Sequence, residues 1–301
     1  MLLESFDLTY AKSLDDAIDL KNEWGDEAAF YAGGTELLQV LKEGLIVCNH
    51  LISLRRVPSM DQIMMDEDSR LITIGAMATH DNIAHSSVIH QYHPAFAELE
   101  NNIGNIRVRT AGTIGGNLAF AEPRSDPGAF LVAANAIILA KSSSKTRRIP
   151  MSEFWQGPFE TSLEPGEVIT HVLLPVLEKR TGAAYRKFSV AEFPMAGVAA
   201  IIQLDDQNEN ILKARLVVSA ANPIPTRLTN AEKLLAGEAI NDIPKTVAWW
   251  VAAAEPQMDA LDDNDGSAEY KTQVVGALLR EAVTEAIQRA KEEGHSWQHT
   301  R

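Results

Sequence analysis

The feature that most constrains this chain is a pair of glycines, Gly33-Gly34, between a short apolar run and a helix-forming stretch. Residues 28–31 predict a β-strand, and a predicted helix begins at Thr35 and ends at Gly44. Glycine tolerates a positive φ and lets the main chain approach another group closely. Free N–H groups at a helix start, with the positive end of the helix dipole, suit a phosphate or diphosphate. A tight turn without a ligand remains the alternative, because the segment has neither a GxGxxG fingerprint nor a P-loop lysine.

A second glycine-rich segment places Gly115-Gly116 between Thr113 and Asn117. The side chains of Thr and Asn can exchange hydrogen bonds with phosphate or sugar oxygens. The surrounding stretch, residues 107–128, is long and rich in glycine, which predicts a functional loop and not a simple connection.

Periodicity along the rest of the chain predicts an α+β protein. Polar, turn-rich residues at 58–70 indicate a subdomain boundary, and the pattern changes again after Pro175, where two β runs form a predicted hairpin. We therefore divide the chain into a first domain at 1–175, with subdomains of about 1–57 and 58–175, a second domain at 176–291 and a tail at 292–301. The predicted helices are 13–24 (capped by Ser13), 35–44, 81–86, 94–103, 127–134 (capped by Asp126), 230–236, 243–254 and 268–291, and further predicted strands are 50–54, 71–74, 137–140, 196–204 and 211–220.

The composition of the chain limits the kinds of molecule it can bind and indicates where in the cell it works. The chain has 41 acidic and 27 basic residues, and its net charge of -14 argues against nucleic-acid or anionic-membrane surfaces. Its one cysteine, Cys48, excludes an intrachain disulfide and a cysteine-ligated iron–sulfur or zinc site, and we expect a buried, inert thiol. No apolar run approaches about 18 residues, so no membrane span is expected. The first ten residues carry acids and no basic group, which predicts no signal peptide and a cytoplasmic protein.

The histidines form no recognised metal pattern. His80, His85, His90 and His93 fall in one stretch but lack the HExxH spacing, and we expect them at the surface or at helix caps. No metal site is predicted in this chain, and no Ser-His-Asp or Cys-His set is evident.

Three stretches resemble one protein family. AGGTELLQVLKEG (32–44), VRTAGTIGGNLAFAEPRSDPGAFLVAANA (108–136) and EPGEVITHVLLP (164–175) are similar, in order and spacing, to the FAD-binding medium subunit of the xanthine dehydrogenase and carbon monoxide dehydrogenase family. The resemblance covers nearly the whole chain. It implies the FAD-binding PCMH-type fold, which is vanillyl-alcohol-oxidase-like: two α/β subdomains clasp FAD, and a C-terminal domain of antiparallel strands packs with helices.

The resemblance also implies which residues hold FAD. Main-chain N–H groups would wrap the diphosphate at Ala32, Gly33, Gly34, Thr35, Glu36 and Leu37. A second wall for the diphosphate and ribityl chain would consist of Thr113, Ile114, Gly115, Gly116 and Asn117. Ser125 and Asp126 would hold ribityl or ADP hydroxyls, and Ile169 and Leu173 would line the adenine or flavin edge. Lys187 would approach the flavin ring, where its charge would stabilise reduced flavin; a solvated strand lysine is the alternative.

Two departures from the family pattern bear on FAD. Thr110 stands where relatives often have Asn, so that the amide contact there is lost. Thr35 stands where some relatives have His, and in the wider fold a histidine near this place can bind flavin covalently. Because threonine is a poor group for such a bond, we expect non-covalent FAD.

The family resemblance implies a relay among three subunits. A large subunit would oxidise substrate at a molybdopterin centre, a small subunit would pass electrons through [2Fe-2S] clusters, and this chain would pass them through FAD to an external acceptor. The expected assembly is a dimer of such heterotrimers. Two alternatives stay open: a stand-alone FAD-dependent oxidoreductase of the same fold, and a non-catalytic flavin-binding scaffold subunit.

Overall fold

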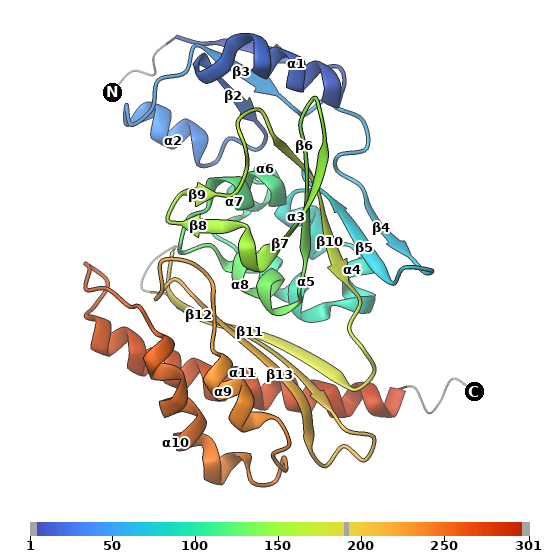
Figure 1. Cartoon of the computed structure of the whole chain (residues 1–301), viewed down its shortest axis with the longest axis vertical. Coiled ribbons are helices and arrows are strands. Elements are labelled where there is room, and N and C mark those ends of the chain that lie inside the picture. The colour runs from blue at the N-terminus through green and yellow to red at the C-terminus, as the bar shows by residue number, and fades with distance from the viewer. Residues whose placement is uncertain (1–4, 190–192, 297–301) are drawn as a thin grey trace.

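The computed structural model describes residues 5–189 and 193–296 and arranges them in three parts along the long axis of the molecule (Figure 1). The first part is a three-stranded parallel sheet in the order β1-β3-β2. Ser13 caps the first helix as predicted, because its hydroxyl accepts a hydrogen bond of 3.0 Å from the N–H of Asp16. The elements of this part are β1 (Asp7–Tyr10), α1 (Leu14–Trp24), a 3₁₀ turn (Gly25–Glu27), β2 (Ala28–Tyr31), α2 (Leu37–Lys42) and β3 (His50–Ser53).

The second part is a five-stranded antiparallel sheet in the order β4-β5-β10-β6-β7. Ile72 and Ile74 alternate along β5 and are fully buried, the period expected of a strand with one covered face. The elements are β4 (Ile63–Asp66), β5 (Leu71–Gly75), α3 (His80–Ala84), α4 (Ser87–Tyr92), α5 (Pro94–Asn101), α6 (Ile106–Ala111), α7 (Ile114–Phe120), α8 (Asp126–Ala133), β6 (Ile137–Lys141), β7 (Thr146–Pro150), a 3₁₀ turn (Met151–Glu153), β8 (Trp155–Gly157), β9 (Glu160–Thr161) and β10 (Val168–Pro175).

Residues 107–128, predicted to be a functional loop, are largely helical, because they contain α7 and parts of α6 and α8. The Thr113 hydroxyl caps α7 by accepting a hydrogen bond of 3.1 Å from the N–H of Gly116. Gly115 lies within α7, and α7 packs against Ala76. A glycine is needed at residue 115 because a Cβ there would be 2.6 Å from the Ala76 Cβ. Glycine here allows two segments to pack closely, and composition alone does not distinguish this use from a loop.

The third part is a four-stranded antiparallel sheet in the order β11-β12-β13-β14. The predicted hairpin is present as β12 and β13, whereas β11 was not predicted. The long helix α11 lies on this sheet so closely that a Cβ on Gly182 would be 2.0 Å from the carbonyl oxygen of Ala286. The elements are β11 (Thr181–Ser189), β12 (Pro194–Leu204), β13 (Ile211–Ser219), β14 (Thr226–Arg227), α9 (Thr229–Leu235), α10 (Ile243–Ala254), a 3₁₀ turn (Glu255–Gln257) and α11 (Ala268–Ser296).

The helix predicted to end at residue 291 continues to Ser296, so the first residues of the predicted tail are helical. Residues 297–301 of that tail lie outside the described residues. The predicted fold class, a FAD-binding α+β domain followed by antiparallel strands with helices, is confirmed.

Helices α5 and α8 lie between the second and third parts and join them (Figure 1). Two polar contacts reinforce the junction: Arg289 on α11 binds Glu98 on α5 at 2.6 Å, and the Tyr185 hydroxyl on β11 donates to Asp126 on α8 at 2.7 Å. The sheet of the third part therefore forms one side of the region where α8 begins, which is also where the candidate site lies.

Candidate FAD-binding site

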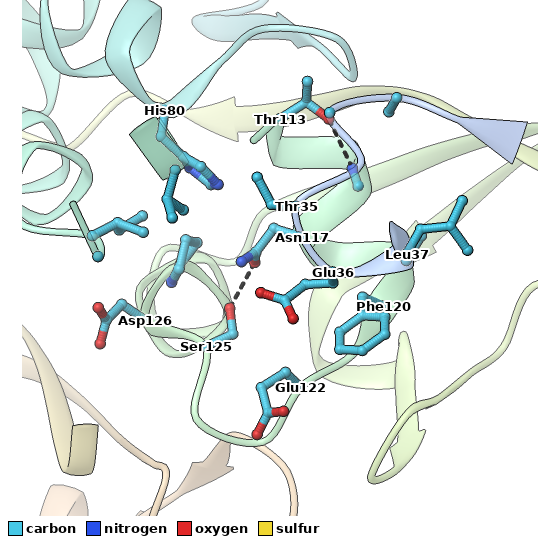
Figure 2. A pocket seen from close by; sticks show the side chains of 18 of the residues that line it. Thr35, Glu36, Leu37, His80, Thr113, Asn117, Phe120, Glu122, Ser125 and Asp126 are labelled. Atoms are coloured by element: carbon cyan, nitrogen blue, oxygen red, sulfur yellow. Dashed lines mark hydrogen bonds between the residues drawn. The ribbon is translucent and has the colours of Figure 1, made fainter. Parts of the chain in front are cut away.

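A cavity lies where the three parts of the molecule meet, and Figure 2 shows its walls from close by. Its walls come from the turn before α2, from the helices α3, α6, α7 and α8, from the segment between α5 and α6, and from the start of β12. Most of the predicted site residues line it: Ala32, Gly33, Gly34, Thr35, Glu36, Leu37, Thr113, Gly116, Asn117, Ser125 and Asp126. The sequence segments 32–37 and 113–126, far apart along the chain, thus form one site.

The turn before α2 presents unused main-chain donors. Within the described residues, no N–H group from Gly33 to Leu37 donates a hydrogen bond to another group of this chain. The turn is held from outside, because the Arg55 Nε donates to the carbonyl of Ala32 at 3.3 Å. Gly34 has φ +77, and a Cβ on Gly33 would be 2.2 Å from the carbonyl oxygen of Ala111. Both positions therefore require glycine, and the turn suits an anionic diphosphate.

The second glycine segment is built differently, because its N–H groups are already used. Ile114 donates to Ala78 at 3.0 Å and Gly115 donates to Ala76 at 2.9 Å. The next two N–H groups in the chain, those of residues 116 and 117, both bond to Thr113. Ile114 and Gly115 are buried against the sheet and do not line the cavity. This segment contributes a surface of Thr113, Gly116 and Asn117, and within the described residues the N–H groups from Ile114 to Asn117 all have partners in the chain.

Ser125 and Asp126 stand at the start of α8. Ser125 occupies the N-cap position, one residue before the predicted cap Asp126, which is the first helical residue. The Ser125 hydroxyl donates to the Asn117 side-chain oxygen at 2.6 Å, so the two residues fix each other on the cavity wall. This bond, drawn as a dashed line in Figure 2, joins the two predicted segments 113–117 and 125–126.

Asp126, which is buried, and Lys187, which is partly exposed, form an ion pair. The Lys187 Nζ is 2.5 Å from one Asp126 oxygen, and the Tyr185 hydroxyl donates to the other at 2.7 Å. Burial raises the pKa of Asp126, and the charge of Lys187 opposes this effect. The Lys187 Nζ also donates to the carbonyl of Asn102 at 2.9 Å. Lys187 is therefore no solvated strand lysine; it lies behind Asp126 and not on the cavity wall.

Ile169 and Leu173 are placed away from the cavity. Both are buried on β10, a strand that lies inside the five-stranded sheet between β5 and β6. Neither lines the cavity wall.

Sequence reasoning also missed an acid–base pair, of which the histidine lines the cavity. His80, expected at the surface or at a cap, is buried, and its Nδ1 is 2.6 Å from an oxygen of Glu100, which is fully buried. His93 stands at the N-cap of α5, a cap position as predicted, but it is buried; its Nε2 is 2.8 Å from the Pro175 carbonyl oxygen, and burial lowers its pKa to about 4. His85 is exposed, as predicted. No sequence spacing signals the pair, because α3 and α5 meet only in the folded chain.

Other missed residues surround the turn before α2. Burial raises the pKa of Glu36, the charge of Glu122 raises it further, and Arg124 lowers it. The Arg124 guanidinium also lies 4.4 Å from the ring centroid of Phe193, over the other end of the cavity wall. Glu122 and Arg124 stand in the stretch 108–136, so the segment was noticed without these two side chains.

A cavity with a glycine turn of free N–H groups, beside a partly buried ion pair, suits a cofactor that carries a diphosphate. The chain matches the FAD binding domain in molybdopterin dehydrogenase over residues 4–177 and the CO dehydrogenase flavoprotein C-terminal domain over residues 183–286. It belongs to the family of FAD-binding medium subunits of molybdenum hydroxylases, which are oxidoreductases, and its cofactor is FAD.

Relatives with known names support this assignment over their full length. The chain is 31% identical to the 6-hydroxypseudooxynicotine dehydrogenase complex subunit alpha of Paenarthrobacter nicotinovorans, over 98% of this chain and 99% of the relative. It is 31% identical to the carbon monoxide dehydrogenase medium chain of Afipia carboxidovorans, over 97% and 100%. A solved carbon monoxide dehydrogenase from Hydrogenophaga pseudoflava superposes with a TM-score of 0.91 at 28% identity, covering 96% and 99%.

Cys48 is buried as predicted, near Leu41 and Leu51 behind α2. Among the helices of the described residues, none is long and apolar enough to cross a membrane. In the same residues, no three His, Cys, Asp or Glu side chains gather in a way that could hold a metal ion.

Proposed function

We propose that this chain receives electrons from [2Fe-2S] clusters of a partner subunit and passes them through non-covalent FAD to an external acceptor. The observation that carries the proposal is the turn at Gly33 to Leu37, whose main-chain N–H groups have no partner within the described residues. Bound FAD would supply the chemistry, since a flavin accepts electrons and releases them again. The protein's part is to hold the cofactor and to set the charges around it.

The proposed placement of FAD follows the polarity of the cavity. The diphosphate would lie on the N–H groups of Gly33 to Leu37, where its negative charge meets the start of α2. The flavin would lie at the end lined by Ile103, Gly104 and Val108, next to Asp126, because small and apolar groups there leave room for a flat ring. Asp126 would meet the cofactor as half of an ion pair, since Lys187 and Tyr185 hold both of its oxygens.

Non-covalent binding is favoured by the side chains near the turn. Thr35 lines the cavity, and its hydroxyl is a weak nucleophile. Cys48, the only cysteine of the sequence, is buried behind α2 and does not line the cavity. FAD should therefore leave intact when the protein is denatured.

We further propose that the chain works in a complex with a large molybdopterin subunit and a small [2Fe-2S] subunit, as a dimer of heterotrimers in the cytoplasm. One cysteine cannot ligate such clusters, so the electron donor must be another chain. The relatives named as medium chains imply larger and smaller companions. Domain limits at 1–175 and 176–291 are part of the same proposal, with β10 ending at Pro175 and β11 beginning at Thr181.

Co-purification tests the proposal most directly. We expect the tagged chain to bring down two further subunits, and we expect the complex to contain molybdenum, iron and FAD in fixed ratios. Acid denaturation should release all flavin into the supernatant as intact FAD. A colourless, partner-free chain would overturn the proposal. A yellow chain that turns over a substrate alone would replace it with a stand-alone oxidoreductase, and a yellow chain that accepts no electrons from its partner would indicate a scaffold.

A further inference from the structure

The pair His80–Glu100 places a titratable group in the wall of the FAD cavity. His80 begins α3, is 2% exposed, and contributes to the cavity wall. Its Nδ1 is 2.6 Å from an oxygen of Glu100 on α5, which is 0% exposed. The second ring nitrogen, Nε2, has no hydrogen-bond partner among the described residues. A buried imidazole with one nitrogen held and the other free beside a cavity is available to the ligand.

The carboxylate of the pair is itself short of partners. The other Glu100 oxygen, Oε1, is buried and has no hydrogen-bond partner in the described part of the chain. With one proton between them, the two side chains keep a net negative charge in a buried place, which is costly, so the pair favours a second proton on Nε2 of His80. Burial raises the pKa of Glu100, and the neighbouring His80 opposes the shift. The proton of the pair therefore responds to any charge that enters the cavity.

The groups that face the pair come from the helices and the strand packed against it. Asp126 on α8 interacts with both members of the pair, and Lys187 and Tyr185 on β11 hold Asp126. Arg109 on α6 is turned to the carbonyls of residues 103 and 104. On α4, His90 is bound to the carbonyl of residue 84. With Asp126 and Lys187 paired, His80 and Glu100 are the adjustable charges at this end of the cavity.

His80 lies at the flavin end under the proposed placement. Figure 2 shows His80 and Asp126 on one side of the cavity and Leu37 and Phe120 on the other. The turn of free N–H groups reaches Leu37, so the diphosphate is expected away from Asp126. The flavin, which gains negative charge on reduction, would therefore be the part of FAD nearest His80.

We propose that His80, held by Glu100, gains a proton when the bound flavin is reduced; this inference rests on the proposed function. When bound, FAD would supply the redox chemistry, and its uptake of two electrons and one proton would add one negative charge to the cavity. A second proton from solvent then binds Nε2 of His80, and the resulting imidazolium charge balances the added charge. Per two electrons the site takes up two protons, with no bond in His80 broken. His80 is a charge-balancing group at the cavity, and Glu100 is the residue that positions it.

The test is the pH dependence of the flavin midpoint potential in the full, FAD-loaded chain, titrated with dithionite. For each proton taken up with two electrons, a rise of one pH unit changes the equilibrium constant of reduction tenfold. This corresponds to a fall of about 30 mV in the midpoint potential. In a plot of midpoint potential against pH, we expect the wild type to have a range of pH in which the slope is steeper by about 30 mV per pH unit. We expect His80→Gln to lack this steeper range, which we call the window. His85→Gln is the matched control, because His85 ends the same helix but is exposed. This control should keep the wild-type window.

Glu100→Gln keeps a group that can accept from Nδ1 but removes the charge, so the window should move to lower pH. This variant also serves if His80→Gln fails to hold FAD. Parallel lines for the wild type and His80→Gln, or a window that Glu100→Gln leaves in place, would overturn the inference while FAD binding stands. A wild-type chain without FAD would instead defeat the proposed function.

Discussion

The two glycine pairs look alike in sequence but do different work in the folded chain. Around Gly33-Gly34, the main-chain N–H groups up to Leu37 have no partner in the described residues. Around Gly115-Gly116, each N–H group is already bonded within the chain, and the first glycine is pressed against Ala76. The first pair keeps donors free for a ligand, whereas the second lets a helix reach the sheet. A glycine pair therefore indicates that another group comes close to the main chain. Only the hydrogen-bond pattern shows whether that group is a ligand or another part of the protein.

The sharpest way to break this comparison is Gly33→Ala. The new Cβ would be 2.2 Å from the Ala111 carbonyl oxygen, so the turn must move. Its N–H groups would then no longer point toward the diphosphate. Losing one or two charge-assisted hydrogen bonds, each about 1.5–3 kcal/mol, should weaken FAD binding about 100-fold. Flavin fluorescence titration of the apo-protein measures the change. Gly157→Ala is the control, since residue 157 lies on β8 with only the Glu160 side chain near. Equal affinity in both variants would contradict a binding role for the turn.

Gly115→Ala should have the opposite profile. Its Cβ would be 2.6 Å from the Cβ of Ala76, and overpacking of this kind destabilises by about 1–3 kcal/mol. Because Gly115 does not line the cavity, we expect the affinity of the folded protein for FAD to fall less than about threefold, roughly 0.6 kcal/mol. Urea unfolding measures the loss of stability.

A second substitution checks that packing is the cause. Ala76→Gly removes the opposing Cβ, so in a double-mutant cycle it should recover part of the stability lost in Gly115→Ala. If Gly115→Ala were to abolish FAD binding while leaving the urea midpoint unchanged, the second segment would be a binding loop after all.

Thr113 offers a smaller change within the second segment. Thr113→Val removes the hydroxyl that accepts from the N–H of Gly116, and loss of such a cap costs about 1 kcal/mol. The free energy of unfolding should fall by this amount. Thr113→Ser keeps an oxygen in place and should stay near the wild type. A loss of stability in Thr113→Ser that Thr113→Val does not share would show that the methyl group, not the cap, matters.

The sequence sufficed for features with a local cause. The strand before Gly33, the cap at Ser13 and the hairpin of β12 and β13 each follow from neighbouring residues, and each is present. Residues 107–128 misled because a glycine that allows packing resembles a glycine that allows a loop.

The site was predictable in part for the same reason. The turn before α2 and the Ser125-Asp126 pair could be chosen from local pattern and family resemblance, and both line the cavity. The contacts of Asp126 with Lys187 and of His80 with Glu100 join elements that meet only by tertiary packing. Such pairs produce no regular spacing of residues that a single sequence could reveal. The family resemblance implied that Ile169 and Leu173 line the cofactor, but both are buried on β10 inside the sheet.

The smallest expected effect concerns charge at the first glycine turn. Burial raises the pKa of Glu36, whose carboxylate stands beside the free N–H groups. A carboxyl whose pKa is raised on folding stabilises the fold below its unfolded pKa, and this contribution is lost as pH rises through the folded value. Its negative charge above that value also repels the FAD diphosphate.

Glu36→Gln should therefore raise FAD affinity a few-fold at neutral pH, on the scale of a screened, part-buried charge of about 0.5–1 kcal/mol. The gain should vanish as pH falls, because wild-type Glu36 then carries a proton and is also neutral. Fluorescence titrations at several pH values measure this, with Glu43→Gln, an exposed carboxylate at the end of α2, as control. If the free N–H groups instead bind the Glu36 carboxylate in the apo-protein, the affinity gain will persist at low pH. The first glycine turn would then satisfy its own donors, and its difference from the second would disappear.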